Sequence, residues 1–310
     1  MMEFISSTFT SYVALVPVTL AQSFILAFVV MGIMIPFRTL QFPDLTSEGA
    51  YPLGGCICGV LIAAGVNPAL AILAALACGF LAGCCTALIH LRFRIHTLLA
   101  GILMMTMLYS INLRIMGKSN LSIFGSDSVY NWAPFVTPGF PVSKIIVAGL
   151  IGAAVFLALN WFFKTEKGTA LRAVGSNPAM AEAQGISVWV STIVGVGLAS
   201  AFSATSGALM VQSQGFADVN MGLGILINGL AALMIGEAVV GKKSVWRQLL
   251  APFVGAIIYY QLVSLCLAAG MPPPDLKLAT GLFVLAMLAL PSLKRGRGAG
   301  GSPAREKFRE

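Results

Sequence analysis

The sequence consists largely of apolar blocks that are long enough to cross a lipid bilayer. Of its 310 residues 58% are hydrophobic and only 10% are charged, and the mean hydropathy is +0.90. Soluble domains carry roughly a quarter charged residues, whereas a membrane-spanning helix needs about 20 apolar residues. We therefore predict an all-α polytopic integral membrane protein with about 8–10 transmembrane helices. The apolar segments lie at about 12–35, 49–64, 69–91, 95–116, 142–163, 188–213, 222–240, 248–269 and 275–291. The second and the ninth are short, which leaves a re-entrant or broken helix open at either.

The basic residues are distributed unevenly between the loops that join these segments. If the first helix runs from outside to inside, 15 of the 19 Lys and Arg face the cytoplasm, and Arg114, Lys118, Lys144 and Lys277 remain outside. This asymmetry follows the positive-inside rule, and it accounts for the net charge of +8 without a nucleic-acid partner. We expect residues 292–310 to form a basic, disordered cytoplasmic tail near the membrane lipid.

Two stretches of the sequence resemble each other. "FPDLTSEGAYPLGG" begins at Phe42 and "FADVNMGLGILING" at Phe216, and both read Phe-x-Asp before a Gly-rich apolar segment. If the first four apolar segments are moved along the sequence by the distance between the two stretches, they coincide with the last four. Because an odd number of helices intervenes, the two halves would have opposite orientations in the membrane; chance similarity is the alternative. The prediction is a transmembrane domain over 1–291, with inverted repeats at roughly 12–116 and 188–291 and a linking helix at 142–163.

Inverted repeats are typical of transporters, in which the substrate path runs near the interface of the repeats. The two similar stretches would then start helices from opposite sides of the membrane, with Asp44 cytoplasmic and Asp218 external. Glycines allow close packing of helices, and asparagines supply polar groups to an otherwise apolar path. The candidate pathway residues are Asp44, Gly49, Gly54, Gly55, Asp218, Asn220, Gly222, Gly224 and Asn228.

A short helix is predicted within the cytoplasmic stretch "KTEKGTALRAVGSNPAMAEAQGIS". Asn177 is a good N-cap, Pro178 suits the first helical position, and Gly185 suits the end. The residues between them favour helix. Two interpretations stay open: an ordinary interfacial turn, or a docking surface for a cytoplasmic partner.

The stretch "GEAVVGKKS" comes within one residue of a phosphate-binding P-loop. Gly236, Gly241 and Lys242 fit the pattern, but Lys243 stands where a Ser or Thr should hold magnesium. The stretch also follows a predicted membrane helix rather than a strand. It therefore predicts a basic cytoplasmic turn and not an ATP site.

The sequence has no recognisable catalytic or metal-binding constellation, so we expect no enzymatic activity, no metal and no cofactor. Glu237 is the one acid placed within an apolar segment, and Lys242 or Lys243 is close enough in sequence to pair with it. Proton relays in membranes normally use several ionisable groups. A stand-alone ion-coupled secondary transporter nevertheless remains an alternative, because inverted repeats are equally typical of that class.

Over roughly residues 15–290 the sequence resembles the membrane permease subunits of ABC importers, in the family that includes branched-chain amino acid and monosaccharide systems. The most specific match is "GTALRAVGSNPAMAEAQGIS", which is similar to the cytoplasmic signature of that family. "GEAVVGKK" replaces the Gly-Gly and "GGxG" pattern of the sugar and branched-chain members. This difference favours a subgroup that is served by small binding proteins and takes amino-acid-like substrates.

The resemblance implies alternating access in a bacterial cytoplasmic (inner) membrane, with the C-terminus in the cytoplasm. ATP would be bound and hydrolysed by separate cytoplasmic ABC ATPase subunits, and an extracytoplasmic substrate-binding protein would deliver the solute. A second permease subunit, identical or related, would complete the pathway. Two loops compete for contact with the ATPase, with candidate residues Gly168, Arg172, Gly175, Asn177, Pro178, Glu182 and Gly185 in one and Gly241, Lys242 and Lys243 in the other.

Overall fold

The computed structural model describes residues 2–132, 141–241, 244–272, 275–276, 278–283 and 285. These residues are almost entirely helical, which confirms the predicted all-α class. The elements are α1 (Met2–Met34), η1 (Ile35–Leu40), α2 (Thr46–Ala63), α3 (Pro68–Phe93), α4 (Thr97–Met116), β1 (Asn120–Ser122), η2 (Val129–Trp132), α5 (Pro141–Lys164), α6 (Glu166–Ser176), α7 (Pro178–Ala183), α8 (Val188–Gln214), β2 (Phe216–Asp218), α9 (Ile225–Val240) and α10 (Val245–Ala268).

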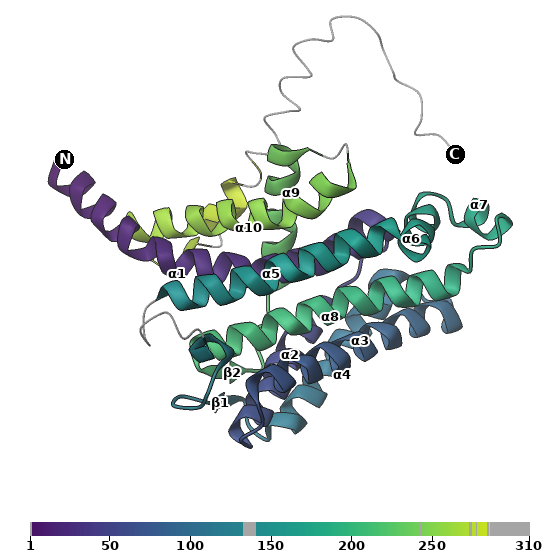
Figure 1. Cartoon of the computed structure of the whole chain (residues 1–310), viewed down its shortest axis with the longest axis horizontal. Coiled ribbons are helices and arrows are strands. Elements are labelled where there is room, and N and C mark those ends of the chain that lie inside the picture. The colour runs from purple at the N-terminus through teal and green to yellow at the C-terminus, as the bar shows by residue number, and fades with distance from the viewer. Residues whose placement is uncertain are drawn as a thin grey trace, which may run out of the picture.

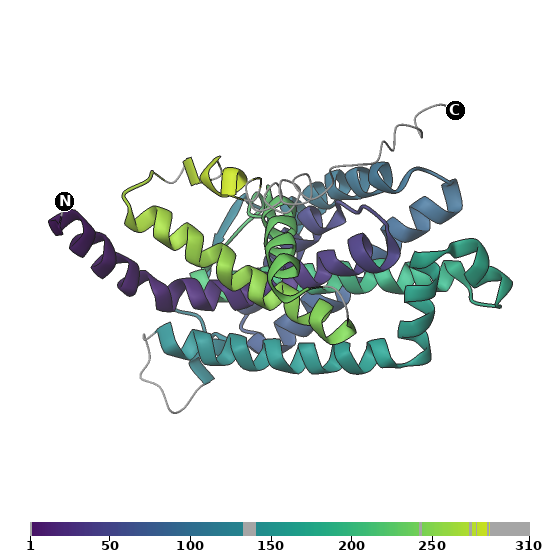
Figure 2. The same cartoon turned by 90° about the horizontal axis from the view of Figure 1, so that it is seen from above.

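Eight of the nine predicted apolar segments are helices, namely α1 to α5 and α8 to α10. Within the described residues, six helices are long and apolar enough to span a membrane: α1 continued by η1, then α3, α4, α5, α8 and α10. The shorter α9 lies across the long axis of the molecule in both views (Figures 1 and 2). Most of the ninth segment, and the whole tail at 292–310, lie outside the described residues.

The first helix of each predicted repeat packs against the opposite half of the molecule. Helix α8 lies along α2 and α3, whereas α1 lies along α10 and also contacts α9 (Figure 1). Polar side chains join the two long helices to each other: the Ser206 hydroxyl of α8 donates to the Ile25 carbonyl of α1 at 2.6 Å. Such interhelical hydrogen bonds are typical of membrane bundles. We propose that this exchanged packing reflects the inverted repeat.

Small residues bring the central helices into backbone contact. Gly54 of α2 and Gly207 of α8 face each other's helix so closely that a Cβ on either would lie 1.9 Å from a carbonyl oxygen, of Ala204 and Tyr51 respectively. Gly83 of α3 likewise faces α8, where a Cβ would lie 2.4 Å from the Val196 oxygen. Helix α8 is therefore fixed tightly against α2 and α3.

The two ends of the bundle differ in structure. At one end β1 and β2 form a short antiparallel pair, with Asn120 opposite Asp218 and Ser122 opposite Phe216. At the opposite end α6 and α7 project beyond the long helices (Figure 1). The strand pair joins the loop after α4 to the second Phe-x-Asp stretch, which therefore lies at this end of the bundle. The helix α7, from the predicted cytoplasmic stretch, lies at the other end (Figure 1).

Candidate functional site

The helix predicted between Asn177 and Gly185 is α7. The Asn177 side chain accepts a hydrogen bond from the backbone N–H of Met180 at 3.1 Å, and Pro178 is the first helical residue. Gly185 follows the helix with a φ of +79°, a conformation that strongly favours glycine. The capping chemistry therefore folds this stretch as the sequence predicts.

The candidate residues of α6 and α7 fall into two groups. Gly168, Arg172 and Gly175 fix the segment to the rest of the protein. Arg172 donates hydrogen bonds to the carbonyl oxygens of Phe163 at 3.1 Å and Gly168 at 3.4 Å, which fastens α6 to the end of α5. The other group is exposed to the solvent side: Asn177, Pro178, Glu182 and Gly185. The exposed group could meet a partner, while the first group holds it in place.

The apolar residues around α7 add to this exposed surface. Met180 of α7 has 63% of its surface exposed, and Trp189 and Val190 at the start of α8 have 46% and 60% exposed. The Ser187 hydroxyl caps α8 by accepting from the N–H of Val190. Trp189 and Val190 begin a helix that is long and apolar enough to span a membrane, so these two side chains also suit the membrane interface.

The π-helix η1 packs against α6. The Gly175 backbone approaches η1 so closely that a Cβ would lie 1.6 Å from the Thr39 oxygen. On its other side, Arg38 of η1 forms a two-point salt bridge with Glu237 of α9, with Nε 2.6 Å from Oε1 and a second contact between Nη2 and Oε2. Glu237 is buried, whereas the Arg38 side chain is 45% exposed. The sequence did not point to Arg38 as a partner of Glu237, and the predicted partners Lys242 and Lys243 lie outside the described residues.

The second candidate loop begins where α9 ends. Gly241 closes α9, and its N–H donates to the Glu237 carbonyl at 3.0 Å. Lys242 and Lys243 lie outside the described residues. The Ser244 hydroxyl then caps α10 by accepting from the N–H of Arg247. Since Gly241 ends a helix and follows no strand, the described geometry is not that of a P-loop.

The first Phe-x-Asp stretch forms a buried turn at the start of α2. Asp44 is fully buried, and its Oδ1 accepts from the N–H of Thr46 at 2.8 Å and also from the Thr46 hydroxyl. The Thr46 hydroxyl lies 2.9 Å from that of Thr86 on α3. Burial raises the pKa of the Asp44 carboxyl, and the two hydrogen bonds from Thr46 act in the opposite direction.

The second Phe-x-Asp stretch forms the same local turn in a more open place. The Oδ1 of Asp218 accepts from the N–H of Asn220 at 2.6 Å, again two residues further on. Asp218 is half-buried at the end of β2, and Asn220 is exposed. Gly224 precedes α9 with a φ of +83°.

A small cavity of about 60 Å³ joins the two halves of the molecule. Its lining includes three candidate pathway residues, Gly49 from the first half and Asn220 and Gly222 from the second. Gly222 touches α2, because a Cβ there would lie 2.1 Å from the Glu48 carbonyl oxygen. Asn112 of α4 also lines it and was not predicted. Its amide donates to the Gly49 oxygen at 3.3 Å, and its Oδ1 is buried with no partner within the described residues.

The remaining pathway candidates lie elsewhere. Gly54 packs on α8, and Gly55 lies against the flexible end of Met221, 2.0 Å from where its Cβ would be. Asn228 of α9 accepts a hydrogen bond from the Tyr259 hydroxyl of α10 at 2.9 Å. The structure thus brings three of the predicted residues together at one cavity and places the others in turns and helix contacts.

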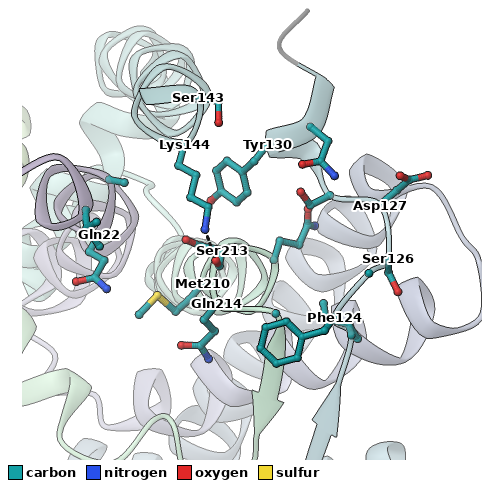
Figure 3. A pocket seen from close by; sticks show the side chains of 18 residues that line it. Gln22, Phe124, Ser126, Asp127, Tyr130, Ser143, Lys144, Met210, Ser213 and Gln214 are labelled. Atoms are coloured by element: carbon teal, nitrogen blue, oxygen red, sulfur yellow. Dashed lines mark hydrogen bonds between the residues drawn. The ribbon is translucent and has the colours of Figure 1, made fainter. Parts of the chain in front are cut away.

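A larger pocket of about 650 Å³ lies at the opposite end from α6 and α7. It is bordered by α1, the start of α5, the end of α8 and the loop after β1, and Figure 3 shows the Lys144 side chain directed toward its centre. The Lys144 ammonium donates to the Ser213 carbonyl at 2.5 Å. A cation at the C-terminal carbonyls of a helix is a favourable arrangement, so Lys144 stabilises the end of α8. Gln22 and Gln214 add amide groups to the polar wall (Figure 3).

Comparison with known proteins identifies relatives along most of the chain. Residues 17–290 match the family described as the permease component of branched-chain amino acid transport systems. The tyrosine transport system permease protein of Clostridioides difficile is 37% identical over 274 residues, which cover 88% of this chain and 90% of that protein. The ribose import permease protein of Escherichia coli is 23% identical over 242 residues, 77% of this chain and 73% of that one. No solved structure matches.

Proposed function

This chain belongs to the branched-chain amino acid transport system permease family, the membrane components of ABC importers, and we propose that its own substrate is an amino acid. The observation that carries this proposal is the 37% identity to a tyrosine transport permease along 88% of the chain. The ribose permease is less similar, with 23% identity over 77% of the chain. The small glycine- and asparagine-lined cavity between the halves supports a narrow path for a small polar solute.

The proposed mechanism is alternating access driven by separate ABC ATPase subunits. The exposed surface around α7 would receive the ATPase, and α6 would carry its movement inward, since Arg172 and Gly175 fix α6 to α5 and η1. ATP binding can shift the protein toward an outward state only if the ATPase contacts the two states differently. A rigid, capped segment such as α6–α7 would suit such a contact, because it could transmit force without deforming.

The proposed assembly contains two permease chains in a bacterial cytoplasmic membrane, with α6–α7 and the C-terminus on the cytoplasmic side. A substrate-binding protein would meet the opposite end, where β1, β2 and the pocket around Lys144 lie. The basic residues support this orientation, because Arg38, Arg92, Arg94 and the α6 segment belong to the predicted cytoplasmic loops.

Reconstitution into vesicles tests the proposal. The permease would be incorporated alone, or together with its ATPase and binding protein, and uptake of radiolabelled tyrosine would be measured with and without ATP, with ribose as the comparison solute. We expect ATP-dependent tyrosine uptake only in the complete system. Uphill uptake by the permease alone would instead favour an ion-coupled secondary transporter, and ATP-dependent uptake of ribose but not tyrosine would overturn the amino acid assignment.

A further inference from the structure

The six-residue π-helix η1 contacts α6 on one side and the interior of the protein on the other. On one side Gly175 of α6 lies against the Thr39 carbonyl, with no space for a side chain. Leu171 of α6 is 1% exposed, and both Leu171 and Leu40 reach the surface of α8 at Gly195. Since backbone and side-chain contacts both join them, α6 and η1 should move together.

On its other side η1 is joined to α9 by charge. The Arg38 guanidinium contacts both carboxylate oxygens of Glu237. Two-point guanidinium–carboxylate pairs fix orientation as well as distance. Glu237 is only 7% exposed, so it lies where an unpaired carboxylate is costly. If η1 moves, α9 must therefore follow Arg38 or leave a buried charge without this partner.

Helix α2 begins, and helix α9 ends, close to η1. The chain leaves η1 through Gln41, which has a φ of +53°, and reaches α2 after the buried Asp44 turn. Helix α9 runs from Glu237 back toward Gly222 and Asn220, which line the cavity shared with α2. A displacement of η1 would thus reach α2, which lines this cavity, and α9, which follows the loop residues Asn220 and Gly222 that also line it. π-Helical turns within longer helices often occur at functional sites.

We propose that the Arg38–Glu237 pair is a positioning contact that transmits movement of α6–α7 to α9 during transport. The inference rests on the proposed function, because it assumes that an ATPase displaces α6–α7. Its content is specific: η1 is the coupling element, and the paired charges, rather than apolar packing alone, make α9 move with it. Removing the pair should leave ATP hydrolysis running without equivalent solute movement.

The decisive variant is Arg38→Gln combined with Glu237→Gln. Either single change removes one side of this ion pair, so a loss of transport there would be explained equally well by poor folding. The double change removes both charges and keeps side chains that can hydrogen-bond. Arg92→Gln is the matched control, since Arg92 is an exposed basic residue in the last turn of α3. Each variant would be reconstituted with its ATPase and binding protein, and tyrosine uptake and ATP hydrolysis would be measured in the same vesicles.

We expect the double variant to assemble with the ATPase and to hydrolyse ATP, while the tyrosine taken up per ATP falls at least tenfold; Arg92→Gln should match wild type. Unchanged uptake per ATP in an assembled double variant would overturn the inference. If that variant does not assemble, Arg38→Lys decides, because it keeps the charge but loses the two-point geometry: uptake per ATP should fall severalfold, and an unchanged ratio would again overturn the inference. Absence of ATP-dependent uptake in wild type would count against the proposed function instead.

Discussion

The two Phe-x-Asp turns have the same local design and different surroundings. In both, the aspartate Oδ1 accepts a hydrogen bond from the backbone N–H two residues later, at 2.8 Å for Asp44 and 2.6 Å for Asp218. Asp44 is fully buried, whereas Asp218 is half-buried at the edge of the β1–β2 pair. Short sequence patterns therefore set the hydrogen bonds of a turn, and the helices packed around it set its burial.

The burial of the first turn has identifiable causes. Thr86 of α3 places its hydroxyl 2.9 Å from that of Thr46. Gly101 of α4 lies so close that a Cβ there would be 2.7 Å from the Leu45 nitrogen. Two membrane helices thus enclose the Asp44 turn, while the Asp218 turn pairs with a three-residue strand and packs on α2. Under the proposed mechanism the first turn is a fixed point and the second can adjust.

The largest difference is expected for the glycines that follow the two turns. Gly54→Ala would place a Cβ 1.9 Å from the Ala204 oxygen, so α2 and α8 would have to separate. We expect a loss of about 3 kcal/mol or more in the free energy of unfolding. Gly224→Ala puts alanine at a φ of +83°, and the expected loss is about 1 kcal/mol. Unfolding in mixed detergent micelles would measure both, and equal losses would show that the segments after the two turns are not differently constrained.

A smaller difference is expected when the acceptors themselves are removed. Asp44→Ala leaves the buried Thr46 N–H and hydroxyl without Asp44 as acceptor, so we expect a loss of about 2–3 kcal/mol. Asp218→Ala frees the N–H of exposed Asn220, which water can reach, and the expected loss is about 0.5–1 kcal/mol. The same unfolding assay would compare them. A larger loss at Asp218 would contradict the proposed division between fixed and adjustable turns.

Patterns that depend on neighbouring residues were predictable from the sequence. Eight apolar segments form helices, since a long apolar run specifies a membrane helix with little help from other parts of the chain. The cap at Asn177, the proline after it and the left-handed Gly185 were equally predictable, because each acts within a few residues. The short α9 was predicted as a helix, but its course across the bundle was not (Figures 1 and 2).

Contacts between distant residues were not predictable in the same way. Glu237 pairs with Arg38, 199 positions away, although lysines follow it by only a few residues. This contact depends on how η1 and α9 are packed, which no local sequence pattern reports. Asn112 gave a weak signal as an amide within an apolar segment, but its place beside Gly49 depends on how α4 packs on α2. The functional roles of the pathway and coupling residues remain predictions.

The smallest expected effect concerns pH and separates the two aspartates by their burial. Burial raises the pKa of Asp44 above its ordinary value of 3.8, so the folded state holds this proton more tightly than the unfolded state does. The resulting contribution to stability is fully present below pH 3.8 and is lost as the pH rises through the raised pKa. The Asp44→Asn variant has no ionisable group at this position, and its amide oxygen can still accept the hydrogen bonds from Thr46.

The stability of Asp44→Asn relative to wild type should therefore increase as the pH rises from about 4, and then level off once Asp44 is ionised in both states. Asp218→Asn makes the same chemical change at the other turn, so subtracting its effect corrects for the general loss of one acidic group. Thermal unfolding in detergent between pH 4 and 8 would measure both differences. A corrected difference that stays constant or falls with pH would mean that burial does not control the ionisation of Asp44, and the contrast between the turns would then be one of packing alone.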